Sequence, residues 1–375
     1  MKLTIKKDLL MDALNKVSKA ISTKNLIPVL AGIKFDLTKK KLTLTASDND
    51  ITIQTIIEST NEENFKIEKE GKIIIQGKYI LDIVRKLPAK YINIEVIDEL
   101  KILIYSENSE FNLNGISEKE YPNIDLEENK KKITINGGLF KEIVNQTSFA
   151  ASNEESKPVL TGINFNIVGN ILECNSTDSY RLARKIITLD KASDENYNVV
   201  IPSHNIVEFS RLINDEEKEV ELHVFNNKIL FIYNNIKFQS RLISGTYPNT
   251  SNLMPNTSFL TINTNLNDFY HVIDRASILT SDKEKNIVTL ETEDNTLIVR
   301  SSSLEIGRVE EKMEISKNND ENIRISFSAK YMMEALKSFS TENVEINFVG
   351  EVKPIILKSK DDETLTQLVL PIRTY

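Results

Sequence analysis

The sequence predicts an α+β chain of three tandem, similar domains, each with two helices packed on antiparallel sheets. Short runs with period-two alternation and many β-branched residues occupy most of the 375 residues, which is typical of half-buried antiparallel strands. Six segments instead place apolar residues at helical spacing. Similar segments also recur in the same order three times along the chain, which indicates an internal repeat.

The first helical segment covers residues 8–21, where Leu10, Leu14, Val17 and Ile21 share one face. Apolar residues three or four positions apart form such a face only in a helix. The other five expected helices cover residues 78–87, 139–149, 203–213, 266–279 and 330–339. The six helices therefore form three pairs, one pair for each domain.

The expected strands alternate apolar and polar residues, so each exposes one face and buries the other. The clearest strands cover residues 42–45, 51–54, 92–96, 220–224, 296–299 and 344–348. Turn residues separate them, as at Gly169-Asn170, Asn226-Asn227 and Asp294-Asn295. Such dipeptides between alternating runs favour hairpins, and hence antiparallel pairing.

Three copies of the repeat can be aligned directly. PVLAGIKF at residues 28–35 is nearly repeated by PVLTGINF at residues 158–165. The second helix of each copy begins within IQGKYILD, IPSHNIVE and FSAKYMME, which start at Ile75, Ile201 and Phe327. We therefore predict domains at residues 1–126, 127–250 and 251–375, joined by polar linkers near residues 126–132 and 250–258.

Composition limits the class of protein. Hydrophobic residues make up 40% and charged residues 27% of the chain, as in soluble globular proteins. No apolar run is long enough to span a bilayer, and the charged N-terminal segment does not have the pattern of a signal peptide. The single cysteine, Cys174, lies in an apolar alternating run. We expect a buried thiol in a cytoplasmic protein.

No catalytic constellation is visible in the sequence. The three histidines, His204, His223 and His271, lie in separate elements without metal-ligand spacing. The glycines form no phosphate-binding loop. Asp178 taken alone could be proposed as a catalytic acid. However, Asp48 stands at the same place in the first copy, and this recurrence favours a repeated turn or cap. We expect a non-enzyme without cofactor or metal.

The distribution of charge is uneven. The net charge of −8 argues against tight binding of nucleic acid. Positive residues nevertheless gather on the expected helices, where they would suit loose, sequence-independent contact with phosphates or would simply form solvated faces. These residues are Lys16, Lys19, Lys78, Arg85, Lys86, Lys90, Arg211, Arg275, Lys330 and Lys337.

One stretch, residues 157–184, differs from its copies. Its second half contains Asp178-Ser-Tyr-Arg181, where the first copy has Asp48-Asn-Asp-Ile51 and the third has Leu304-Glu-Ile-Gly307. Arg181 has no equivalent in the other copies, so a repeated structural role does not require it. The sequence therefore predicts a specific site here, with a surface salt bridge as the alternative.

These features together resemble the family of bacterial replicative sliding clamps, the beta subunit of DNA polymerase III. The resemblance rests on the repeat spacing, on PVLAGIKF and PVLTGINF, and on STDSYRLAR, FQSRLISGTYPN and the terminal LVLPIRTY, and it covers essentially the whole chain. It implies a head-to-tail homodimeric ring, with helices around encircled duplex DNA and sheets outside. It also implies a processivity factor whose clients, the polymerase III catalytic subunit, the clamp loader and repair proteins, bind through short peptide motifs.

The resemblance also implies site residues. The partner-peptide site would take Val159, Leu160, Thr177, Ser179, Tyr180, Arg181, Leu182, Pro248, Leu253, Tyr331, Pro354, Leu368, Leu370, Pro371, Ile372 and Arg373. Loops that contact DNA would carry Lys24 and Lys157. The ring interface would join Phe111 and Leu113 of the first domain to Ile278 and Leu279 of the third.

Two other functions remain open at the level of sequence. A β-rich adaptor would bind only proteins and would never encircle DNA. A nucleic-acid enzyme with an unfamiliar site would nick or extend labelled DNA in the presence of a metal. Whether the protein tracks along DNA distinguishes the first alternative from a clamp.

Overall fold

The computed structural model describes residues 1–375 except 22–26, 256, 281–285, 304 and 374–375. The chain forms two compact units. One contains Met1–Gly138 and Glu208–Leu242, and the other contains Leu139–Val207 and Ile243–Tyr375. Among the described residues, no helix is both long enough and apolar enough to cross a bilayer.

All six expected helices are present and begin within two residues of the predicted positions. They are α1 (Lys7–Val17), α2 (Gly77–Lys86), α3 (Gly137–Thr147), α4 (Ser203–Ser210), α5 (Leu266–Ser277) and α6 (Ala329–Leu336). Several end earlier than predicted because the hydrogen bonds of the last turn span three residues instead of four. After α4, for example, the Leu212 N–H donates to Phe209 O and the Ile213 N–H donates to Ser210 O, and this three-residue spacing ends the α-helix.

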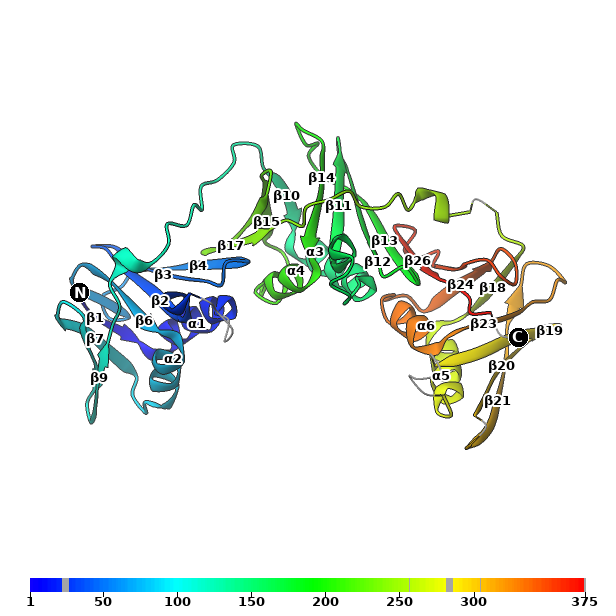
Figure 1. Cartoon of the computed structure of the whole chain (residues 1–375), viewed down its shortest axis with the longest axis horizontal. Helices are drawn as coiled ribbons and strands as arrows, with labels where there is room; N and C mark the ends of the chain where they lie inside the picture. The colour runs from blue at the N-terminus through cyan, green and yellow to red at the C-terminus, as the bar shows by residue number, and fades with distance from the viewer. Residues whose placement is uncertain (22–26, 256, 281–285, 304, 374–375) are drawn as a thin grey trace. The chain divides into compact units, whose positions relative to one another are not determined.

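Helices α1 and α2 pack against each other in the first unit, and α5 and α6 do so in the second (Figure 1). The side chain of Asn265 caps α5 by accepting from the N–H groups of Asn267 and Asp268. Ser328 caps α6 by accepting from the Tyr331 N–H. These caps satisfy amide groups that have no partner within the helix. The local sequence therefore specifies where both helices begin.

The first unit contains two antiparallel sheets. Their strand orders are β5-β1-β7-β8-β9 and β10-β15-β16-β17-β4-β3-β2-β6. The strands are β1 (Lys2–Lys6), β2 (Gly32–Leu37), β3 (Lys41–Ser47), β4 (Ile51–Glu58), β5 (Phe65–Lys69), β6 (Gly71–Gln76), β7 (Tyr91–Asp98), β8 (Lys101–Ser106), β9 (Ser109–Asn114), β10 (Ile133–Asn136), β15 (Glu219–Val224), β16 (Lys228–Tyr233) and β17 (Ile236–Arg241).

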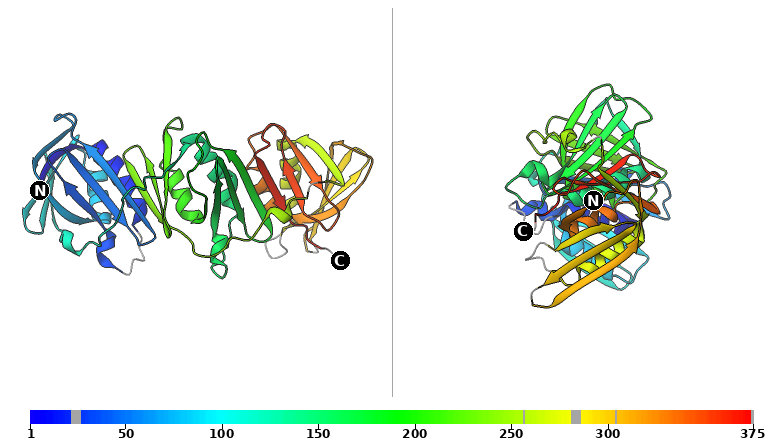
Figure 2. Two further views of the ribbon diagram at one scale, coloured as in Figure 1. Left: turned by 90° about the horizontal axis from the view of Figure 1, so that it is seen from above. Right: turned by 90° about the vertical axis from the view of Figure 1, so that its right-hand side faces the viewer.

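The second unit also contains two sheets. Their strand orders are β14-β11-β12-β13-β26-β25-β24-β18-β22 and β21-β20-β19-β23. The strands are β11 (Gly162–Val168), β12 (Ile171–Thr177), β13 (Arg181–Thr188), β14 (Tyr197–Pro202), β18 (Leu260–Asn265), β19 (Ile287–Glu293), β20 (Thr296–Ser303), β21 (Gly307–Glu314), β22 (Ser316–Lys317), β23 (Arg324–Ser328), β24 (Asn343–Phe348), β25 (Ile355–Lys358) and β26 (Leu365–Val369). In Figure 2 the green strands β11–β13 continue into the red strand β26.

Two strand pairs join segments from different predicted domains. Strand β4 pairs with β17 in the first unit, and β13 pairs with β26 in the second. Because the ladder continues through each pair, a sheet crosses each expected domain boundary. Three sequence repeats therefore give two compact units.

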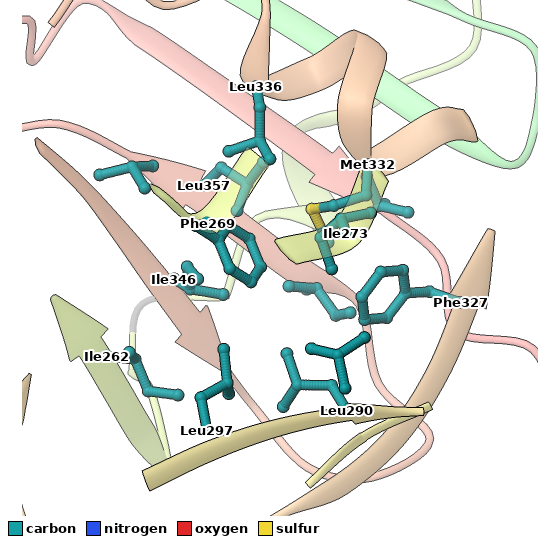
Figure 3. Close-up of a cluster of buried hydrophobic side chains, with 14 of the residues drawn as sticks. Ile262, Phe269, Ile273, Leu290, Leu297, Phe327, Met332, Leu336, Ile346 and Leu357 are labelled. Carbon is teal, nitrogen blue, oxygen red and sulfur yellow. The ribbon is translucent and has the colours of Figure 1, made fainter. Parts of the chain in front are cut away.

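The core of the second unit shows how the amphipathic patterns are satisfied (Figure 3). Phe269 and Ile273 of α5 and Met332 and Leu336 of α6 are buried in one cluster with residues of the surrounding strands, such as Leu290. Fully burying one such side chain contributes about 1.5–3 kcal/mol. The expected burial of Cys174 is also confirmed.

Candidate functional site

The turn before β13 is built by Asp178. Its Oδ1 accepts from the Tyr180 N–H at 2.9 Å and the Arg181 N–H at 3.0 Å, while Ser179 adopts a φ of 79°. Asp48 makes the same turn before β4, with its Oδ1 accepting from the Asp50 and Ile51 N–H groups. The prediction that Asp178 is a repeated turn residue is therefore confirmed.

Arg181 extends from this turn into internal contacts and is only 8% exposed. Its guanidinium donates to Asp178 Oδ2 at 3.0 Å, to Glu334 and to the Phe149 carbonyl at 2.6 Å. It also lies over the Tyr331 ring, with 4.6 Å from Cζ to the centroid. Arg181 thus links the turn before β13 to α6. The salt bridge that the sequence left open as the alternative is present, and Arg181 is buried in it.

An apolar cluster lies beside the turn, where β13 meets β26. Leu182 and Leu368 face each other across the two strands and are buried with Ile356. Met254, Val349 and Leu370 pack against them while remaining partly exposed. A small hollow of about 80 Å³ opens next to this cluster between Pro255, Val349 and Ile356.

A second apolar cluster contains Leu160, Val200 and Tyr247, with Val159 and Ile243 packed against it. Burial raises the pKa of the Tyr247 hydroxyl, and the charge of Asp178 raises it further. Gly245 approaches Val159 with a φ of 129°, and a Cβ there would lie 2.6 Å from Val159 Cγ2. Only glycine meets both constraints.

The C-terminal segment completes the surface. The Leu370 N–H donates to Tyr180 O at 2.9 Å, and the Ile372 N–H donates to Ser326 O at 2.7 Å. The Tyr180 ring stacks on Tyr331, with 6.3 Å between centroids. Of the remaining predicted site residues, Pro354, Pro371 and Ile372 are half-buried, while Pro248, Leu253 and Arg373 are exposed.

The matching junction in the first unit has the same backbone but a different surface. There the Arg241 N–H donates to Asp50 O, as Leu370 does to Tyr180. Thr52 and Gln239 face each other at the positions that Leu182 and Leu368 occupy in the second unit. Leucines on β13 and β26 thus give only the second of these two junctions an apolar surface suited to peptide anchors.

Most of the predicted DNA-contacting residues are exposed on helices. Lys78 and Lys86 of α2 and Lys330 of α6 are exposed, and so is Lys157, which lies in a loop. Lys337 lies over the Tyr270 ring. Three arginines are paired with carboxylates on the surface: Arg85 with Asp82, Arg211 with Glu208 and Arg275 with Glu311. Lys24 lies outside the described residues. The contact of these side chains with DNA stays a prediction.

Two of the predicted interface residues lie on an edge strand, and the other two follow a helix. Phe111 and Leu113 belong to β9, the last strand of its sheet, and Phe111 is exposed. Ile278 follows α5 and is 73% exposed, while Leu279 is half-buried. Exposed large apolar side chains such as Phe111 and Ile278 are consistent with an interface.

Sequence reasoning missed several residues at the candidate partner surface. Ile356, Met254 and Val349 complete the apolar cluster, and Glu334 and Phe149 hold Arg181. Met254 lies within a predicted linker, where its apolar character was the only available signal. The others sit within ordinary strand or helix patterns that carry no sign of a site.

Replacing Arg181 by methionine should strongly destabilise the second unit. The change leaves the half-buried Asp178 and Glu334 carboxylates without their cation and the Phe149 carbonyl without a donor. Removing one partner of such a hydrogen-bonded set typically costs about 1–3 kcal/mol. Urea titration followed by circular dichroism measures the effect. Arg275→Met, which removes an exposed ion pair with Glu311, serves as the control and should change the midpoint little. Equal midpoints for the two variants would contradict the structural role of Arg181.

Comparisons with known proteins agree with this geometry. Family models for the N-terminal, central and C-terminal domains of the DNA polymerase III beta subunit match residues 1–125, 134–249 and 251–373. The beta sliding clamps of Staphylococcus epidermidis and Staphylococcus aureus are 40% and 38% identical over 377 residues, with all of each chain covered. The solved structure of the Bacillus subtilis DNA polymerase sliding clamp is 37% identical, covers all of both chains and gives a TM-score of 0.96. The chain therefore belongs to the DNA polymerase III beta subunit family, the bacterial sliding clamps.

Proposed function

We propose that this protein works as one half of a two-chain ring, which encircles duplex DNA and tethers the replicative polymerase and other clients to it. The observation that carries the proposal is the repeated junction. Strand β4 pairs with β17 and β13 pairs with β26, each joining neighbouring repeats. The third repeat offers the corresponding strand β21, and the first offers β9.

Both of these strands are sheet edges, since β9 ends the order β5-β1-β7-β8-β9 and β21 begins the order β21-β20-β19-β23. An unpaired edge is a template for another strand. If β21 of each chain pairs with β9 of the other, the third junction repeats the first two and two chains close a ring. Burying Ile278, which is 73% exposed, would contribute about 1.5–3 kcal/mol before association costs, and Phe111, Leu113 and Leu279 would each contribute less because they are already partly buried.

Retention on DNA would then depend on topology more than on affinity. The protein carries a net charge of −8, and several helical arginines are already paired with carboxylates. Loose contacts from Lys24, Lys78, Lys157 and Lys330 to phosphates allow sliding. The role requires no catalysis and no cofactor, and it places the protein in the cytoplasm with the replicated DNA.

Clients would bind at the apolar surface of the second unit. Two clusters, one around Leu182 and Leu368 and one around Leu160 and Tyr247, flank a polar turn. Such a surface suits a short extended peptide with hydrophobic anchors. The polymerase III catalytic subunit, the clamp loader and repair proteins would share this one site on each chain.

A loading experiment tests the ring. After a clamp loader has placed the labelled protein on nicked circular DNA, gel filtration should show it co-eluting with the circle. Cutting the circle with a restriction enzyme should release nearly all of it, because a closed ring leaves only over an end. Protein that stays bound after linearisation would point to ordinary phosphate binding, and failure to track on DNA at all would favour the protein-only adaptor.

A further inference from the structure

Each chain contains two junctions between neighbouring repeats, and their strand ladders match. Five residues of β4 face five of β17 at the first junction, and five of β13 face five of β26 at the second. Ile53 faces Phe238 at the first junction, as Ala183 faces Gln367 at the second. Because the two ladders correspond residue by residue, a difference in stiffness between them comes from their side chains.

A buried ion triad crosses the second junction. Lys185 of β13 is 2% exposed, and its Nζ donates to Glu142 of α3 at 2.7 Å and to Asp362 at 2.9 Å. Glu142 belongs to the second repeat and Asp362 to the third. Arg181 joins the same two repeats, because it links the turn before β13 to α6. Such charge-assisted hydrogen bonds are short and directional, so they fix the geometry of the junction.

Gln367 of β26 adds a neutral link. It is 1% exposed, and its Nε2 donates to the Gln146 carbonyl of α3 and to Ser338 Oγ, both at 2.9 Å. Gln146 lies in the second repeat and Ser338 in the third. Buried polar contacts whose donors have partners make a structure more rigid. Three buried polar side chains therefore fasten the second junction.

The described residues of the first junction form none of these three links. The positions of Arg181, Lys185 and Gln367 are occupied there by Ile51, Thr55 and Phe238. The side chains of Ile51 and Phe238 cannot form hydrogen bonds. Thr55 is fully buried, yet its Oγ1 has no hydrogen-bond partner among the residues that the structure describes. An unpaired buried hydroxyl costs stability, so it weakens this junction.

Side-chain contacts nearer the surface also cross the first junction. They join Asn235 Nδ2 to Ile56 O at 2.7 Å, Lys228 Nζ to Asp125 Oδ2 at 2.8 Å and Lys237 Nζ to Leu126 O at 3.3 Å. Contacts of long, partly exposed side chains contribute little to stability. Burial of Ile53 and Phe238 remains, and the hydrophobic effect is not directional. The first junction can therefore bend while it keeps its apolar contacts.

We propose that the β4–β17 junction is a hinge within each chain, whereas the buried polar side chains lock the β13–β26 junction. The hinge takes up the bending when a closed ring opens to admit DNA, and this role rests on the ring proposed above. Hinges concentrate such motions in a few residues, while the packed elements around them move as rigid bodies.

Hydrogen exchange of the full-length protein, measured by mass spectrometry on peptides from each strand, compares the two junctions. Amides of β4 and β17 should exchange about tenfold faster than those of β13 and β26, because the less stable junction opens more often. The neighbouring strands β3 and β12 are the internal control and should exchange at similar rates. Equal exchange at the two junctions would overturn the proposal.

Thr55→Val removes the unpaired hydroxyl and keeps the shape of the side chain. This variant should slow the exchange of β4 and β17 about threefold, because the buried polar atom is gone. Thr52→Val on the same strand is the matched control. Thr52 Oγ1 lies 2.8 Å from Ser47 Oγ, so the loss of this hydroxyl should speed exchange. If Thr55→Val speeds exchange as Thr52→Val does, its hydroxyl has a partner in solution and the proposal fails.

Disulfides test the role of the hinge in the ring. Ile53→Cys with Phe238→Cys locks the first junction and Ala183→Cys with Gln367→Cys locks the second, since each pair faces across its ladder. On nicked circular DNA with a clamp loader, the oxidised first pair should load about tenfold more slowly than the same variant after reduction. The oxidised second pair should load at the rate of its reduced form.

Loading of the oxidised first pair at the rate of its reduced form would overturn the hinge, whereas failure of the unmodified protein to load would overturn the ring. The exchange measurement does not depend on the ring, so the two failures can be told apart.

Discussion

A chain carrying Val309→Cys and Phe111→Cys should form a covalent dimer after mild oxidation, with almost all chains cross-linked into closed rings. The reason lies in the register of the two junctions seen within the chain. The third residue of β4, Ile53, faces the third residue of β17, Phe238. Likewise the third residue of β13, Ala183, faces the third residue of β26, Gln367. The third residues of β21 and β9 are Val309 and Phe111.

The pair also has the right geometry for a disulfide. In the β4–β17 junction the Arg241 N–H donates to Asp50 O and the Ile56 N–H donates to Asn235 O. Ile53 and Phe238 lie between these bonds and form a non-hydrogen-bonded pair, for which the Cα atoms are typically about 4.5 Å apart. This distance is within the range of disulfides, and the native Cys174 is buried and should not compete.

Phe111→Cys with Glu310→Cys is the matched control. Neighbouring residues of a strand point to opposite faces, so this pair should cross-link poorly although its sequence position differs by one residue. Non-reducing gel electrophoresis with sedimentation measures the outcome. Equal cross-linking of both pairs would refute the register. A fast-migrating oxidised monomer would show instead that a single chain closes on itself.

Local sequence patterns predicted most of the helices and strands correctly. The alternation at residues 51–54 and the helical face at residues 8–21 each specify an element through their own spacing, and β4 and α1 formed as expected. The joined sheets could not be predicted in the same way. Strands β4 and β17 lie far apart in the sequence, and nothing in either pattern specifies the other as its partner. The division into two units follows from these long-range pairs.

The candidate site could likewise be predicted only where a local sequence signal exists. Arg181 stood out because the other repeats have Ile51 and Gly307 in its place. Its buried role depends on Glu334 and the Phe149 carbonyl, which come from distant segments.

Replacing Leu370, Pro371 and Ile372 together with alanine should weaken binding of a client peptide about thirtyfold or more. Leu370 packs on the cluster of Leu182, Ile356 and Leu368, and the segment after it lies along Ser326. All three side chains are half-buried, so they offer apolar surface to a ligand while contributing modestly to the core. Losing one hot spot costs about 2 kcal/mol or more, which corresponds to roughly a thirtyfold loss of affinity.

Fluorescence anisotropy with a labelled peptide that carries Gln, Leu and Phe anchors measures this loss. The backbone hydrogen bonds of Leu370 and Ile372 are retained by alanine, so dimer mass and melting temperature should change little. Ile97→Ala with Leu100→Ala removes exposed apolar side chains elsewhere and should bind the peptide like the unmodified protein. If the triple variant keeps an affinity within threefold of the unmodified protein, the clients bind at another surface.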